Sequence, residues 1–246
     1  MKSRKIDWLV RGAIAVALVT LAFVVWRKQH PHFTVRDIRA TKNDAALRVL
    51  FIGNSHTFVN DLPVAFAKLV EAKHPSRPLA ITDVTMGGVT LADHLADGTA
   101  ARTIARERWD YVVLQEQSDI PRGAPEQLED AVRRFAPLIE AAHARTVLYE
   151  VPPHRGATPT FDAYDRAARA ANAIVVRAGE AWVRALSRDH AIVLYQDDGN
   201  HPAKAGTYLT ACVFYATLLE ESPENLSTAG LVTPELAVKL QAVARP

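Results

Sequence analysis

Two short segments, far apart in the 246-residue sequence, carry residue types that can perform nucleophilic catalysis. The first is Gly-Asn-Ser-His-Thr at 53–57, which follows a short apolar run and leads into a segment with helical spacing. A serine in such a turn has its hydroxyl above the sheet edge, where backbone N–H groups face a developing anion. Ser55 is therefore a candidate nucleophile. The alternative is that Ser55 or Thr57 only caps a helix, the commoner role of a serine in this position.

The second segment is Asp-Asp-Gly-Asn-His-Pro at 197–202, which follows another apolar run. Its spacing allows Asp198 to accept a hydrogen bond from one imidazole nitrogen of His201, which leaves the other nitrogen free to take a proton from a hydroxyl. Asp197 could replace Asp198, although its spacing from the histidine is less suitable. The alternative is an acidic turn with a capping aspartate and a surface histidine.

Two further turns offer groups that can stabilise an oxyanion. A glycine pair, Gly87 and Gly88, can present backbone N–H groups to negative charge or can form a plain turn. Gln117 lies in Gln-Glu-Gln-Ser-Asp at 115–119, and its uncharged amide can donate a hydrogen bond without competing as a base. Both turns, like the two segments above, follow an apolar run. This conjunction favours one shared active site.

A parallel sheet would bring these turns to one edge. Short apolar or β-branched runs predict five strands, at 49–52, 79–84, 111–114, 146–151 and 191–195. Segments with helical spacing alternate with them, at 62–73, 91–106, 125–142 and 161–186, and a further helix is predicted at 203–219. The alternation predicts a flavodoxin-like three-layer α/β/α sandwich with a five-stranded parallel sheet. Ligands of such sheets bind at the carboxyl ends of the strands.

The four segments together resemble the SGNH (GDSL-like) hydrolase superfamily, and the resemblance covers essentially all of 48–219. In that family the first block supplies the serine and an oxyanion N–H group, and the second supplies a glycine N–H group. The third supplies an asparagine amide, and the last supplies Asp-x-x-His. The resemblance thus implies a triad of Ser55, Asp198 and His201, with an oxyanion hole formed by Ser55, Gly88 and Gln117.

The sequence departs from the family pattern at two positions. Asn54 replaces the aspartate of the usual Gly-Asp-Ser, and Gln117 stands where the family has the asparagine of Gly-x-Asn-Asp, with one extra methylene. The Leu-Gln-Glu-Gln-Ser sequence at 114–118 looks like that of a divergent bacterial branch.

The resemblance implies a serine ester hydrolase that forms an acyl-enzyme on short acyl esters, acetyl among them, of small molecules or carbohydrates. The alternatives are an O-acyltransferase with the same triad, and a non-catalytic carbohydrate-binding or scaffold domain. Five residues near the predicted strand ends are candidates for substrate contact, although a structural role for His56 is at least as strongly indicated: Asn54, His56, Glu116, Glu150 and His154.

The N-terminal residues predict a membrane segment. Basic residues precede an apolar stretch at 8–25 that Arg11 interrupts, and basic residues follow it. A spanning helix needs roughly 17 to 25 residues, so the stretch is long enough if Arg11 reaches the interface. We predict a signal anchor or transmembrane helix at 1–28, a linker at 29–47 and a hydrolase domain at 48–246, outside the cytoplasm on the periplasmic or extracellular face. The alternative is secretion after signal cleavage.

Composition narrows the remaining classes. A net charge of +2 with no basic stripe after the first 40 residues argues against a nucleic-acid partner. The single cysteine, Cys212, cannot form an intrachain disulfide or a thiolate cluster. The sequence has no metal-ligand spacing and no phosphate-binding glycine loop, so we predict neither a metal nor a cofactor.

Overall fold

The computed structural model describes residues 33–245. The predicted signal-anchor helix at 1–28 lies outside these residues and stays a prediction. Within 33–245 no helix is both long enough and apolar enough to cross a membrane.

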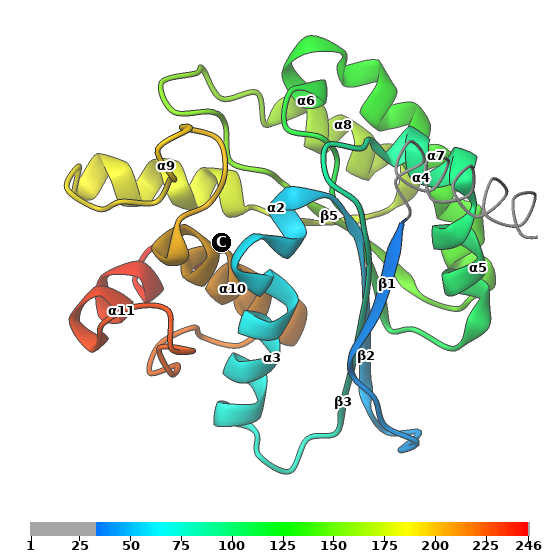
Figure 1. Ribbon diagram of the computed structural model, residues 1–246, viewed down its shortest axis with the longest axis horizontal. Coiled ribbons are helices and arrows are strands. Elements are labelled where there is room, and N and C mark those ends of the chain that lie inside the picture. Colours follow the sequence, from blue (N-terminus) through cyan, green and yellow to red (C-terminus); the bar gives the residue numbers. More distant parts are fainter. Residues whose placement is uncertain (1–32, 246) are drawn as a thin grey trace, which may run out of the picture. The chain divides into compact units, whose positions relative to one another are not determined.

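A six-stranded, mostly parallel sheet forms the centre of the described chain (Figure 1). The strands are β1 (Thr34–Arg39), β2 (Leu47–Gly53), β3 (Leu79–Thr85), β4 (Tyr111–Leu114), β5 (Arg145–Tyr149) and β6 (Ile174–Val176). Their order is β1-β3-β2-β4-β5-β6, and only β1 is antiparallel to its neighbour. Without β1, the parallel strands follow the 2-1-3-4-5 order of flavodoxin-like sheets. Their carboxyl ends therefore share one edge.

Helices cover both faces of the sheet (Figure 1). One group includes α3 (Leu62–Lys73), α9 (Ala178–Arg188), α10 (Lys204–Leu219) and α11 (Pro234–Gln241), and α10 contacts the other three. The second group is α4 (Leu91–Asp97), α5 (Thr99–Arg106), α6 (Ile120–Gly123), α7 (Pro125–Ala141) and α8 (Asp162–Ala171). Two short helices, α2 (Ser55–Phe58) and η1 (Val59–Asp61), connect β2 to α3. The mixed α/β architecture confirms the predicted α/β class, but the sheet has six strands, one of them antiparallel, instead of the predicted five parallel strands.

The core explains why α10 is apolar around its whole circumference. Phe214 on α10 packs against Phe51 of β2 and Tyr149 of β5, with ring centroids 5.5 Å and 5.4 Å apart. All three side chains are fully or almost fully buried. This packing fixes α10, and hence the loop that precedes it, against the centre of the sheet.

The identity of the last parallel strand was predicted wrongly. Residues 191–195 form no strand, and Tyr195 makes only an isolated bridge with Pro202. The strand is instead β6, which lies inside the predicted helix 161–186. Asn172 ends α8 in the left-handed conformation with φ of 48°, and the β-branched run that follows pairs with β5. A left-handed glycine, Gly98, likewise divides the predicted helix 91–106 into α4 and α5.

The predicted linker at 29–47 contains a strand. Residues 34–39 form β1, which pairs with the edge of β3. The charged side chains of β1 suggest a linker in the sequence, but the fold gives them partners. Arg36 Nε lies 3.0 Å from Asp83 Oδ2, and Asp37 Oδ1 accepts hydrogen bonds from Thr82 at 2.7 Å and from Arg106 at 2.9 Å.

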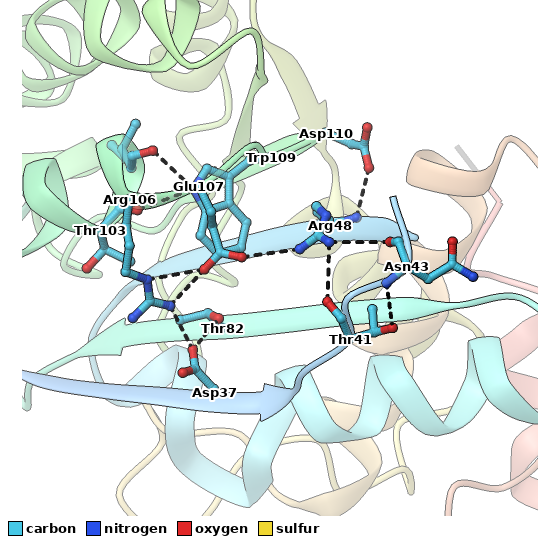
Figure 2. A network of polar contacts seen from close by, with 11 residues as sticks. Asp37, Thr41, Asn43, Arg48, Thr82, Thr103, Arg106, Glu107, Trp109 and Asp110 are labelled. Atoms are coloured by element: carbon cyan, nitrogen blue, oxygen red, sulfur yellow. Dashed lines mark hydrogen bonds and ion pairs between the residues drawn. The ribbon is translucent and has the colours of Figure 1, made fainter. Parts of the chain in front are cut away.

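Figure 2 shows that these polar contacts continue from β1 to the start of β2. Glu107 accepts a 2.9 Å hydrogen bond from Arg106, and its other oxygen accepts a 3.2 Å hydrogen bond from Arg48. The backbone N–H of Arg48 donates to Asp110 at 2.8 Å. This network attaches the chain before β2 to the amino-terminal side of the sheet, at the opposite end of β2 from Ser55.

Candidate active site

Ser55, His201 and Asp198 form a continuous chain of contacts at the carboxyl end of β2. Ser55 is the first residue of α2, and the other two residues lie in the loop before α10. The Nε2 atom of His201 lies 2.9 Å from Ser55 Oγ, and its Nδ1 atom lies 2.6 Å from Asp198 Oδ2. Such an arrangement can remove a proton from a hydroxyl and hold the resulting imidazolium.

The carboxylate of Asp198 is fixed before any substrate binds. Its Oδ1 atom accepts hydrogen bonds from the backbone N–H groups of Asn200 and His201, both at 2.9 Å. These bonds and, above all, the hydrogen bond from the His201 side chain hold the pKa of Asp198 well below its ordinary value. Asp198 thus stays ionised and keeps its imidazole partner oriented. Asp198, and not Asp197, provides this contact.

Gly53 makes the close packing beneath the serine turn possible. A Cβ atom at this position would lie 2.5 Å from both Gln115 Oε1 and Thr57 Oγ1. Gln115 Oε1 occupies that space because it accepts hydrogen bonds from the Asn54 backbone at 2.7 Å and from Thr57 at 2.9 Å. Sequence reasoning missed Gln115, since one glutamine after a strand carries no catalytic signal.

Asn54 does not face the solvent, and the predicted substrate contact is therefore corrected. The residue is 2% exposed. Its Nδ2 atom donates to the Val89 carbonyl at 2.8 Å, and its Oδ1 atom accepts from Gln115 Nε2 at 2.9 Å and from the His56 backbone at 3.2 Å. Asn54 thus ties the serine turn to the turns that follow β3 and β4.

Glu116 and Glu150 are also buried, at 1% and 0% exposure, so neither can reach a substrate as predicted. Glu116 Oε1 accepts backbone hydrogen bonds from Leu91 at 3.0 Å and from Gln117 at 2.7 Å. Glu150 Oε1 accepts a backbone hydrogen bond from Glu180 at 2.9 Å. Burial raises the pKa of each carboxyl group to about 7. Each carboxyl group thus holds a backbone N–H group in the first turn of a helix, α4 for Glu116 and α9 for Glu150.

The two predicted histidines differ in exposure. His56 is 3% exposed, stacks on the His201 ring with centroids 5.6 Å apart, and contacts Asn200 Oδ1 at 3.1 Å through Nε2. Burial lowers the pKa of His56 to about 4, so its ring is neutral at pH 7. This favours the structural alternative. The side chain of His154 is part-exposed and therefore accessible from the solvent. Its Nε2 atom lies 3.1 Å from Ser118 Oγ.

The predicted oxyanion groups occupy the turns that follow β3 and β4. Gly88 is exposed in the turn before α4, with a left-handed φ of 74°. Gln117 contacts Asp119: its Oε1 atom accepts from the Asp119 backbone at 2.8 Å, and its Nε2 atom lies 3.3 Å from Asp119 Oδ2. The amide Nε2 of Gln117 carries two N–H groups, so one can remain with Asp119 while the other donates to an oxyanion. That role stays a prediction.

Comparison with known proteins gives matches only at the level of structure. A scan against protein-family models found no match, and neither did a search of curated protein sequences. Among the described residues, no group of three or more His, Cys, Asp or Glu side chains is arranged to hold a metal ion.

Several solved structures share the fold. A protein from Slackia heliotrinireducens, assigned as an SGNH hydrolase, has 29% sequence identity and a TM-score of 0.59 over 70% of this chain and 99% of its own. A DUF4886 family protein from Bacteroides uniformis has 20% identity and a TM-score of 0.68 over 81% and 93%. An acetylxylan esterase from Geobacillus stearothermophilus has 19% identity and a TM-score of 0.56 over 72% and 96%.

Proposed function

We propose that this chain, a member of the SGNH (GDSL-like) hydrolase superfamily by its structural likenesses, is a serine ester hydrolase with Ser55, His201 and Asp198 as its triad. The carboxylic ester hydrolase class follows from the same likenesses. The observation that carries the triad is the pair of contacts through His201, 2.9 Å to the Ser55 hydroxyl and 2.6 Å to the Asp198 carboxylate.

The reaction proceeds by two acyl transfers. His201 Nε2 takes the hydroxyl proton while Ser55 Oγ bonds to the ester carbonyl carbon, and Asp198 stabilises the imidazolium that forms. The tetrahedral intermediate collapses, the bond to the alcohol breaks, and His201 gives its proton to the leaving alcohol. Water then attacks the acyl-serine with His201 as the base, which releases the acid and restores Ser55.

The oxyanion of the intermediate needs preorganised donors. We assign this role to the backbone N–H groups of Ser55 and Gly88 and to the side-chain amide of Gln117. Removing one such donor costs on the order of 100- to 1,000-fold in turnover. Gln117→Ala therefore tests whether the side-chain amide serves as one of these donors.

We assign the substrate to short acyl esters, with acetyl groups on carbohydrates as the leading class. The support is the structural likeness to acetylxylan and acetyl-xylooligosaccharide esterases, which extends over 72% of this chain. A chromogenic acetyl ester is therefore a suitable first probe.

The nucleophile is tested with a fluorophosphonate probe and with p-nitrophenyl acetate. Ser118 provides a matched control, because its Oγ atom also lies within hydrogen-bond distance of a histidine, at 3.1 Å from His154 Nε2. We expect Ser55→Ala to abolish probe labelling and the acyl-enzyme burst, while Ser118→Ala retains both. Labelling of Ser55→Ala at the wild-type rate would overturn the proposal.

A further inference from the structure

The connection between α2 and α3 contains two consecutive residues in the left-handed region. Asn60 has φ of 54° and ψ of 20°, and Asp61 has φ of 53° and ψ of 60°. Residues with a Cβ atom rarely adopt this conformation, and asparagine and aspartate tolerate it best among them. Two such residues in succession, five and six positions after Ser55, require fixed partners.

Asn60 has its partners on the loop that carries His201. Its Nδ2 atom donates to the Pro202 carbonyl at 2.8 Å and lies 3.1 Å from Thr207 Oγ1 on α10. Pro202 directly follows His201. The amide of Asn60 therefore joins the segment that carries the serine to the segment that carries the histidine.

Asp61 is held from the opposite direction. Its Oδ1 atom lies 2.8 Å from Arg36 Nη1, and the same guanidinium binds Asp83, which is fully buried in β3. The left-handed pair is thus attached to the sheet edge through Asp61 and to the histidine loop through Asn60.

We propose that Asn60 is a positioning residue that sets the distance between Ser55 Oγ and His201 Nε2, an inference that depends on the proposed triad. The two catalytic segments meet through few direct contacts. Besides the 2.9 Å contact itself, His56 reaches Asn200 at 3.1 Å and stacks on the His201 ring. Without the Asn60 amide, the Pro202 carbonyl loses a partner from the serine side. Displacement of a catalytic group by about 1 Å can cost roughly 100-fold in rate.

Two substitutions separate the amide from the backbone. Asn60→Gly tolerates the left-handed conformation but has no side chain to donate. Asn60→Asp preserves the shape but turns a carboxylate oxygen toward the Pro202 carbonyl. The control is Asn172→Gly, because Asn172 is also left-handed, with φ of 48°, and is exposed at the end of α8.

In the full-length protein we expect both Asn60 variants to lower kcat for p-nitrophenyl acetate by about 10- to 100-fold with KM nearly unchanged. Fluorophosphonate labelling of Ser55 should slow in parallel. Asn172→Gly should retain wild-type kcat, and thermal unfolding should show that the variants are folded.

The inference is overturned if either folded Asn60 variant retains kcat within twofold of wild type, or if Asn172→Gly loses as much. A wild-type protein that does not react with the probe overturns the proposed function, and this inference with it. A reactive wild type with unaffected Asn60 variants overturns this inference alone.

Discussion

Asn54 Nδ2 donates a 2.8 Å hydrogen bond to the carbonyl oxygen of Val89, the residue after Gly88. The residue before the candidate nucleophile therefore holds the turn that contains a candidate oxyanion donor. An aspartate, which the SGNH pattern usually has at this position, cannot donate this bond when ionised. In this chain the side chain of Asn54 links the serine turn to the turn that contains Gly88.

We therefore expect Asn54→Asp to impair the enzyme rather than restore a family feature. A carboxylate would face the Val89 carbonyl in a buried site, and an unmade buried hydrogen bond costs about 1–3 kcal/mol of unfolding free energy. Displacement of the turn should lower kcat by about 10- to 100-fold. Steady-state kinetics and thermal unfolding measure both effects. Asn43→Asp is the control, since Asn43 is exposed and its side-chain oxygen accepts a hydrogen bond from the Ala45 backbone, which an aspartate can also accept. Wild-type kcat in Asn54→Asp would refute this account.

The sequence predicts the parts of the fold that repeat a strong local pattern. β4 and α3 have the predicted bounds: β4 is a short apolar run between polar residues, and the helical spacing of α3 ends two residues before Pro75. β1 and β6 could not be recognised in this way. The sequence of β1 is charged, and the partners of its charged side chains are distant in the sequence. β6 is a strand of three residues whose pairing depends on β5.

In the candidate site, too, residue types could be read from the sequence, whereas burial and long-range hydrogen bonds could not. Residue type, spacing and the family resemblance together selected Ser55, His201 and Asp198 as candidates, and the fold brings the three side chains into contact. Burial was not visible in the sequence, so Glu116 and Glu150 were interpreted as substrate contacts although both are inside the protein. The hydrogen-bonding residues Gln115 and Asn60 act through partners that only the folded chain brings together.

Gly53→Ala tests the packing beneath the serine turn. The added Cβ atom would meet Gln115 Oε1 and Thr57 Oγ1 at 2.5 Å, so the turn or its partners must move. Overpacking of this kind costs typically about 1–3 kcal/mol of unfolding free energy. We also expect a loss of at least about tenfold in kcat.

Gly123→Ala is the control for this packing test, because a Cβ atom there meets nothing within 4 Å. Denaturant unfolding and steady-state kinetics of both variants provide the comparison. Equal stability of the two alanine variants would contradict the packing argument.

Glu116→Gln tests the buried carboxyl group through pH. Burial raises the pKa of Glu116 from 4.5 to about 7, so the folded state binds the proton more tightly than the unfolded state. The stability that this contributes is present below about pH 4.5 and is lost as the pH rises toward 7. Glutamine can accept the same backbone hydrogen bonds without a charge. We expect Glu116→Gln to equal wild type near pH 4.5 and to exceed it at pH 8, by up to about 3 kcal/mol.

Denaturant unfolding between pH 4.5 and 8 measures this difference. Glu126→Gln, at an exposed position on α7, should retain the wild-type pH dependence. A Glu116→Gln variant with that same dependence would show that the carboxyl group does not titrate in this range.

Asp198→Asn tests the orientation of His201. The hydrogen bond from His201 holds the pKa of Asp198 well below its ordinary value. The carboxylate therefore contributes to folding stability above the unfolded pKa of about 4, and this stability is lost only in stronger acid. We expect Asp198→Asn to lower kcat throughout pH 5–9, by on the order of 10,000-fold, because an amide favours the wrong imidazole tautomer. Asp197→Asn, one residue earlier, should retain activity. A pH–rate profile of both variants distinguishes them. If kcat falls less in Asp198→Asn than in Asp197→Asn, then Asp197, and not Asp198, orients His201.

Arg36→Met tests whether β1 belongs to the folded domain. Its partner Asp83 is fully buried, so the substitution leaves a carboxylate without its countercharge, which costs about 3–5 kcal/mol. Burial already raises the pKa of Asp83, and protonation should relieve part of the loss in acid. Urea unfolding of the full chain at pH 5 and pH 8 measures this, and the added substitution Asp83→Asn should recover stability.

Arg39→Met is the control: its partner Glu71 is part-exposed, so the loss should be about 1 kcal/mol or less. A loss for Arg36→Met as small as that expected for Arg39→Met would mean that β1 is only loosely attached, as its linker-like sequence indicates.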